Sequence, residues 1–198
     1  PPLPPPAPLA PPPAPPPPPE LRMPAPPPPS HTVSLRAQLT AGLVPGTSPG
    51  FELAVTGRPS ARWGYALAAS YALSQTATRG IGSLDVGLTR AGVLLTFDAA
   101  RSEKVRLVLA AGPSLGALHV AVRRPAPVLQ PGDFWFAAAQ GQIGLQLSVT
   151  KDFFVEFGGA AFVPLARQSF LVQDQAEPVF RQPVVSGLGF FGVGSRFP

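Results

Sequence analysis

The sequence predicts an all-β protein: an eight-stranded antiparallel up-and-down transmembrane β-barrel that follows a disordered, proline-rich N-terminal arm. Three observations lead to this fold class. Large apolar residues alternate with small or polar ones from residue 32 to residue 197, and a period of two indicates β-strands. The second face carries mostly Gly, Ala, Ser, Thr and Gln, which suits the lumen of a narrow barrel. Only 13% of the residues are charged, about half the usual share in a soluble domain.

Composition divides the chain into two regions. Residues 1–29 contain 19 of the 30 prolines, and a run of prolines adopts extended polyproline II instead of forming a core. We therefore expect a linker over residues 1–30 and a barrel over residues 31–198. The chain has no cysteine, which excludes disulfides and thiolate metal sites. Uninterrupted runs of 18 or more apolar residues are missing, so a transmembrane helix is not expected.

The first three predicted strands alternate without interruption. They cover residues 32–43, 51–58 and 62–73, close to the about 9–11 residues that a tilted transmembrane strand needs. Their large, outward residues are Val33, Leu35, Leu39 and Leu43 in the first, Phe51, Leu53 and Val55 in the second, and Trp63, Tyr65, Leu67, Tyr71 and Leu73 in the third.

The fourth and fifth predicted strands, residues 83–97 and 105–122, change parity partway. In the fourth, the large residues Leu84, Val86 and Leu88 precede a shift near residues 89–92, after which Val93, Leu95 and Phe97 continue the outward face. The fifth shifts in the same way to Leu118, Val120 and Val122. A one-residue phase change within a strand is the effect of a β-bulge, so all of these apolar residues are expected to face outward.

The last three predicted strands cover residues 135–149, 153–165 and 184–197.

After the first connection, the links between the eight predicted strands alternate in length. The links at 57–62, 98–104 and 150–152 are short, and those at 74–82, 123–132 and 166–182 are long. Short periplasmic turns and longer outer loops are typical of bacterial outer-membrane barrels. The pattern predicts an outer-membrane location, with the N-terminal arm in the periplasm.

The inward parity carries charges, which a narrow lumen tolerates only in pairs. We expect a plug of salt bridges and amides in the lumen, and a gated or very narrow polar pore is the alternative. The predicted luminal residues are Arg36, Gln38, Glu52, Arg58, Arg62, Asp85, Arg106, Gln140, Gln142, Gln146, Glu156 and Arg196.

Aromatic residues fall near the strand ends, as membrane interfaces favour. Trp63, Phe97, Phe153 and Phe197 form the predicted periplasmic belt. Phe51, Tyr71 and Trp135 form the outer belt.

The last segment of the chain, GLGFFGVGSRF at residues 187–197, resembles the C-terminal signal read by the barrel-assembly machinery. Phe191, Val193 and Phe197 match its alternating apolar residues and terminal aromatic, although Pro198 follows the aromatic and Ser195 interrupts the series. Over residues 32–197 the chain resembles the small eight-stranded outer-membrane β-barrels of the OmpA/OmpX-like class. The resemblance implies outer-membrane lipid and the assembly machinery as partners and gives no activity by itself.

No catalytic, cofactor or metal site is predicted. The two histidines, His31 and His119, lack a cluster of further ligands, and His119 lacks a serine at positions 117 and 121, where both residues are Ala. The net charge of +5 is spread along the chain, whereas nucleic-acid binding needs a clustered basic face. No nucleic-acid partner is therefore expected, and we expect a monomer.

The sequence thus predicts a non-enzymatic structural or interaction protein. Its outer loops, mainly 123–132 and 166–182, would meet partners, and its proline-rich arm would act as a periplasmic spacer that could contact the cell wall or a periplasmic partner. Two alternatives remain: a narrow channel for small solutes or apolar ligands, and a soluble lipocalin-like carrier with the large residues inside. An outer-membrane lipid enzyme lacks a visible triad.

Overall fold

A computed structural model describes residues 30–79, 82–124, 132–170 and 178–197. Residues 1–29 of the predicted arm, and parts of the predicted outer loops, lie outside these residues. Ten strands occur in the described part of the chain: β1 (Ser30–Ala41), β2 (Thr47–Arg58), β3 (Trp63–Arg79), β4 (Gly82–Arg101), β5 (Val105–Arg124), β6 (Gly132–Ser148), β7 (Phe153–Pro164), β8 (Ser169–Phe170), β9 (Phe180–Arg181) and β10 (Ser186–Phe197). None of the described residues belongs to a helix that could cross a membrane.

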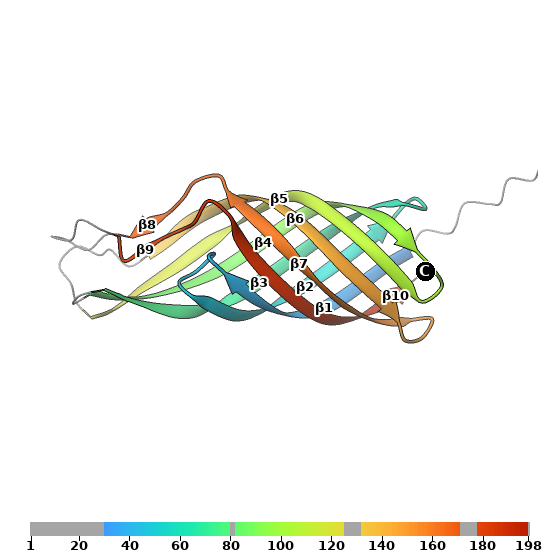
Figure 1. The fold of residues 1–198 in the computed structure, drawn as a ribbon, viewed down its shortest axis with the longest axis horizontal. Coiled ribbons are helices and arrows are strands. Elements are labelled where there is room, and N and C mark those ends of the chain that lie inside the picture. Colours follow the sequence, from blue (N-terminus) through green and yellow to red (C-terminus); the bar gives the residue numbers. More distant parts are fainter. Residues whose placement is uncertain (1–29, 80–81, 125–131, 171–177, 198) are drawn as a thin grey trace, which may run out of the picture.

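Eight of these strands form a closed antiparallel barrel in the order β1-β10-β7-β6-β5-β4-β3-β2 (Figure 1). Strand β1 pairs with both β2 and β10, which closes the wall. The predicted eight-stranded up-and-down barrel is confirmed. The two remaining strands, β8 and β9, pair with each other in the last long connection, where the sequence predicts a loop.

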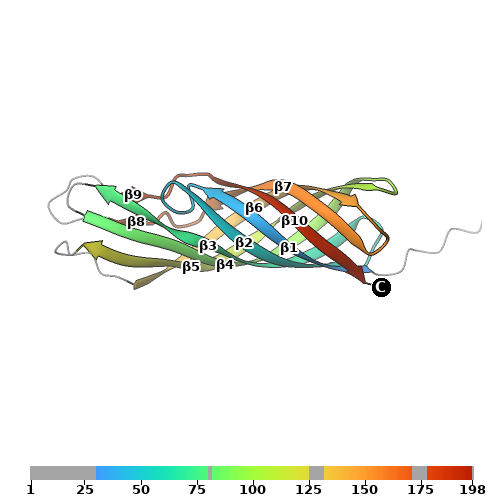
Figure 2. The same ribbon diagram turned by 90° about the horizontal axis from the view of Figure 1, so that it is seen from below.

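The two ends of the barrel differ. Residues 59–62, 102–104 and 149–152 connect strands at the end that also holds Phe197, here called the short-turn end. At the opposite, long-loop end, β3, β4, β5 and β6 project beyond their neighbours (Figures 1 and 2). These strands have 17, 20, 20 and 17 residues, against 12 in each of the other four barrel strands. The predicted connection at 74–82 is therefore mostly strand.

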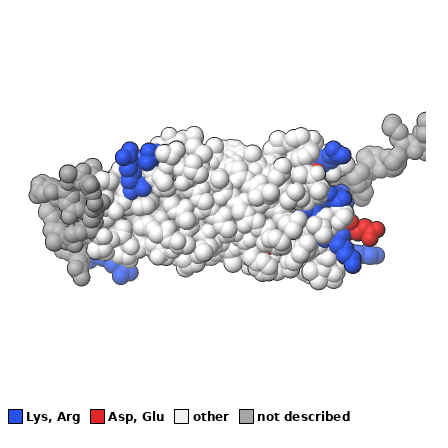
Figure 3. All heavy atoms as spheres, viewed as in Figure 1, with Lys and Arg blue, Asp and Glu red and all other residues white. Residues whose placement is uncertain are grey.

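Alternation sets which side chains face the lumen. In β1, Thr32, Ser34 and Gln38 are buried inside, whereas Leu35 and Leu39 are exposed outside. The same pattern leaves a broad apolar band around the wall, and charged residues gather near the two ends (Figure 3). The soluble-carrier hypothesis required the large residues inside, and their outward position contradicts it.

The expected phase changes in the fourth and fifth strands are wrong. Leu84, Val86 and Leu88 on β4, and Leu118 on β5, are fully buried in the lumen. Both strands keep one parity across the positions where the shifts were expected. The irregularities in register lie elsewhere, for example on β3 between Ala72 and Gln75.

The reason for this error is a change in the chemistry of the lumen along its axis. At the long-loop end the interior is an apolar core, so large residues there occupy the inward parity. The turn at residues 42–46 folds into this core and buries Leu43 and Val44 completely. Positive φ angles of 83° and 65° at Gly42 and Gly46 permit that turn, because only glycine adopts them without strain. The other core members include Phe136, Phe162, Phe170, Leu188 and Phe190.

Candidate functional site: an ion-pair network across the lumen

Strand register places the central charged residues on one row around the barrel. Reading from strand to neighbouring strand, the row contains Arg90, Ser70, Glu52, Arg36, Gly192, Glu156, Gln146, Arg106 and Arg101. It starts on β4 and returns to β4 nearer the short-turn end, because the strands of a closed barrel are staggered. Residues far apart in sequence are thereby brought side by side on neighbouring strands.

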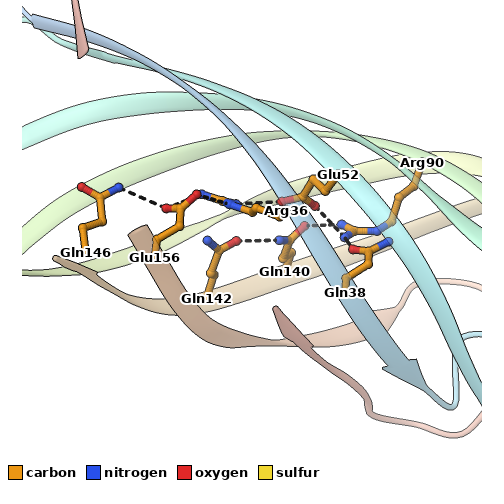
Figure 4. A network of polar contacts seen from close by, with 8 residues as sticks. All are labelled: Arg36, Gln38, Glu52, Arg90, Gln140, Gln142, Gln146 and Glu156. Atoms are coloured by element: carbon orange, nitrogen blue, oxygen red, sulfur yellow. Dashed lines mark hydrogen bonds and ion pairs between the residues drawn. The ribbon is translucent and has the colours of Figure 1, made fainter. Parts of the chain in front are cut away.

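Arg36 is the centre of this row. Its Nη1 donates to Glu52 Oε1 at 2.7 Å, its Nε donates to Glu156 Oε1 at 2.7 Å, and its Nη2 donates to Glu156 Oε2 at 3.2 Å (Figure 4). The pair with Glu156 is therefore bidentate, the strongest geometry for an arginine and a carboxylate. All three side chains are at least nine-tenths buried.

Gly192 makes the bridge to Glu156 possible. On β10 it lies between Arg36 of β1 and Glu156 of β7. A Cβ atom at this position would come within 2.8 Å of Arg36 Cγ. The missing side chain leaves the arginine room to cross β10 and reach the carboxylate.

A second arginine extends the network toward the long-loop end. Arg90 Nη2 donates to Glu52 Oε2 at 2.8 Å, and its two terminal nitrogens also donate to Gln140 and Gln38, at 3.1 and 3.3 Å. On the other side, Gln146 donates to Glu156 at 3.2 Å. Two arginines thus face two glutamates, so the central network is electrically neutral.

Aromatic rings stack on these cations where the polar layer meets the apolar core. The guanidinium of Arg36 lies 4.7 Å from the ring centre of Phe190, and that of Arg90 lies 4.6 Å from Phe162. Such contacts stabilise a cation over the face of a ring. The cavity beside the network has a volume of about 20 Å³, roughly the space of one water molecule. The middle of the lumen is therefore filled with side chains.

The structure places most of the predicted luminal residues inside the barrel. Arg36, Gln38, Glu52, Gln140, Gln142, Gln146 and Glu156 belong to the central network. Arg58 and Arg106 are buried nearer the short-turn end, and Arg196 is half-buried there. Arg196 donates to Ser148 Oγ at 2.9 Å and lies over the Phe154 ring.

Two predicted luminal residues lie elsewhere. Arg62 is exposed in the turn between β2 and β3, because β3 begins one residue later than expected. Asp85 is on the outward parity of β4, where it accepts hydrogen bonds from Thr76 and Arg123. The false phase change in the fourth strand assigned Asp85 to the wrong face.

Two luminal charges were missed. Arg90 lies within the stretch where the phase change was expected. Leu88, Arg90 and Gly92 all occupy even-numbered positions of β4, and a strand without a phase change would have placed them together on the inner face. Asp98 was assigned to a connection, but β4 continues to Arg101, and Asp98 is buried beside Arg58 and Arg106.

The outward residues include the aromatics predicted for the interfaces. Phe51 pairs with Tyr71, and Trp63 pairs with Phe97, with ring centres 5.9 and 4.8 Å apart. Trp135 and Phe153 are exposed on the wall. Phe191, Val193 and Phe197 of the predicted assembly signal also face outward along β10.

His119 has partners that sequence spacing did not reveal. Its Nδ1 lies 2.7 Å from Asp133 Oδ1, and its Nε2 lies 2.8 Å from Thr89 Oγ1, all on the outer face near the long-loop end. Acyl transfer would also need N–H donors to hold an oxyanion. Here the three residues lie within strands whose backbones pair across the wall. Across the described ranges, no group of three or more metal-ligating side chains occurs.

No family model matches the sequence, and no curated protein matches it either. Solved structures do match. A major outer-membrane protein from Thermus thermophilus superposes with a TM-score of 0.63 at 12% identity, and covers 85% of this chain and 99% of that one. OprG from Pseudomonas aeruginosa gives 0.59 at 12% identity, with 85% and 95% covered. Neisserial surface protein A gives 0.56 at 17% identity, with 85% and 97% covered.

The chain has the fold of the small outer-membrane β-barrels. In this barrel the neutral ion-pair network closes the middle of the lumen, and the apolar core lies between that network and the long-loop end. Because the identities are low, the likeness establishes the architecture, and any role must be argued from the residues themselves.

Proposed function

We propose that the protein is a non-enzymatic outer-membrane β-barrel with a structural and interaction role. The observation that carries the proposal is a lumen filled at its middle by a charge-neutral network, inside a wall whose outer surface is apolar. Large residues such as Leu35, Leu95 and Phe191 are more than half exposed on that wall, which lipid would cover. A barrel of this kind anchors other segments of the chain to a membrane instead of passing solutes.

The two ends would then serve different purposes. The short-turn end faces the periplasm in this proposal, since tight turns are typical of that side. The chain enters β1 at this end, because Ser30 pairs with Arg58, so the proline-rich residues that precede Ser30 would extend into the periplasm as a spacer toward the cell wall or a periplasmic partner. The loops at 123–132 and 166–182, with the projecting parts of β3 to β6, would present the contact surface outside. Phe191, Val193 and Phe197 would serve recognition by the assembly machinery.

Membrane insertion predicts that folding depends on detergent. Refolded protein should show β-sheet circular dichroism and a heat-modifiable gel mobility in dodecyl maltoside, and aggregate in buffer alone, because none of the described residues covers the exposed apolar band. Size-exclusion chromatography with light scattering would test the proposed monomer. A folded monomer in plain buffer would overturn the membrane assignment.

The filled lumen predicts electrical silence. Purified protein reconstituted in planar lipid bilayers should give no unitary conductance steps, because Arg36, Glu52 and Glu156 occupy the cross-section. A known open porin reconstituted in parallel controls for insertion. Reproducible small steps in the wild-type protein would instead favour the narrow-channel alternative.

A further inference from the structure

A second group of charges, at the short-turn end, is built differently from the central network. A cavity of about 650 Å³ opens there, lined among others by Arg58, Arg101, Arg106, Lys151 and Arg196. One carboxylate, Glu103, also borders it. The cavity is about thirty times larger than the one beside the central network, as the volumes of 650 and 20 Å³ show.

The charges around this cavity do not balance. Five cationic side chains border it, while the carboxylates that the described residues contribute are Glu103 on its rim and Asp98 behind it. The buried Arg58 and Arg106 share the single carboxylate of Asp98. The central network, in contrast, provides one glutamate for each arginine.

The hydrogen bonding is also incomplete. Only 5% of the Arg58 side chain is exposed, its Nε lies 3.7 Å from Asp98 Oδ1, and both its Nε and its Nη2 lack a hydrogen-bond acceptor among the described residues. The same is true of Arg106 Nη1 and Arg196 Nε. A buried donor without an acceptor costs about 1–3 kcal/mol, and more when it is charged.

Strand pairing adds a like-charge contact. Arg101 and Arg106 are direct cross-strand partners on β4 and β5, and like charges in this position destabilise a sheet. On the other side of the mouth, Ser30 pairs with Arg58 and Thr32 pairs with Arg196. Basic residues from β2, β4, β5 and β10 thus line one opening.

We propose that this mouth binds the phosphate group of an anionic ligand. A phosphate monoester carries a charge of about −1.5 to −2 at neutral pH and three acceptor oxygens, which matches the excess of cations that line the cavity. Arginine forks favour bidentate contacts with phosphate. The volume admits a small molecule that carries the group, and the filled lumen behind Arg58 makes the site a blind pocket. That the mouth faces the periplasm rests on the proposed function, whereas the binding chemistry does not.

Nuclear magnetic resonance of the arginine side chains tests the site. Inorganic phosphate is titrated against protein in dodecyl maltoside at constant ionic strength, with sodium chloride as the compensating salt, and the Nε–Hε signals are followed. Those of Arg58, Arg106 and Arg196 should shift saturably, while those of Arg62 and Arg123 stay in place. A second series adds phosphatidylglycerol to the micelles without inorganic phosphate. Saturable shifts in the second series alone identify a lipid headgroup as the source, and shifts in the first identify a soluble phosphate.

Variants make the result decisive. Arg196→Gln and Arg101→Gln should each weaken phosphate binding about tenfold or more, the loss expected for a hydrogen bond to a charged group. Arg62→Gln, an exposed arginine at the same end, is the matched control and should bind as the wild type does. Heat-modifiable mobility verifies that every variant is folded. Absence of saturable shifts in both series, or equal weakening by Arg62→Gln, would overturn the proposal.

Discussion

Replacing Arg36 by glutamine is expected to lower the free energy of unfolding by about 3–5 kcal/mol, the usual cost of removing one partner from a buried ion pair. Arg36 makes three charged hydrogen bonds, two of them to Glu156. After the substitution Glu156 keeps hydrogen bonds from Gln146 and Ser34 but has no cationic partner among the network residues described above, and its charge stays buried. Urea unfolding in dodecyl maltoside, followed by tryptophan fluorescence, measures the change.

Two further proteins sharpen this prediction. Arg62→Gln removes the same charge from an exposed turn and should change stability little. The double variant Arg36→Gln/Glu156→Gln removes both charges of the bidentate pair and should recover a substantial part of the loss, because no glutamate is then left without its arginine. If Arg36→Gln proved as stable as Arg62→Gln, the network would not close the lumen as described.

Truncating Leu88 to alanine is expected to cost about 2–5 kcal/mol, the range for a leucine removed from a packed core. Leu88 is completely buried among the apolar residues at the long-loop end. The matched control is Leu95→Ala on the same strand, where the side chain is 59% exposed on the wall. Detergent covers that position in the folded state and little packing is lost, so its effect should be clearly smaller.

The comparison also tests the orientation of β4. Sequence alternation predicted that Leu88 and Leu95 both face lipid, which would make the two substitutions equivalent. In the structure the two residues face opposite sides of the wall, because β4 keeps one parity. Leu88 points into the part of the lumen that is apolar, and Leu95 is exposed outside. Equal losses in the same urea experiment would contradict the apolar core at that end.

Much of the fold was available from the sequence. The period of two indicated eight strands, and in β1, β2 and β7 it placed Arg36, Glu52 and Glu156 on the inner side. The short links at 57–62, 98–104 and 150–152 favour antiparallel pairing of the strands that they join. The ends of β3 and β4 were missed because charged or polar residues such as Thr76 and Asp98 occur within the longer strands, where sequence alone suggests a loop.

Alternation is a local property of each strand, and for that reason the eight barrel strands and the presence of inward charges could be inferred without the structure. The sequence could not determine partners, because Arg36 and Glu156 are separated by 120 positions and meet only when the closed barrel sets its stagger. It also could not assign the inner face of β4 and β5, since a large residue can face either lipid or an apolar core. Both points depend on contacts between distant strands: closure aligns Arg90, Glu52, Arg36 and Glu156 on one row, and packing of the apolar core toward the long-loop end requires Leu84, Leu88 and Leu118 inside.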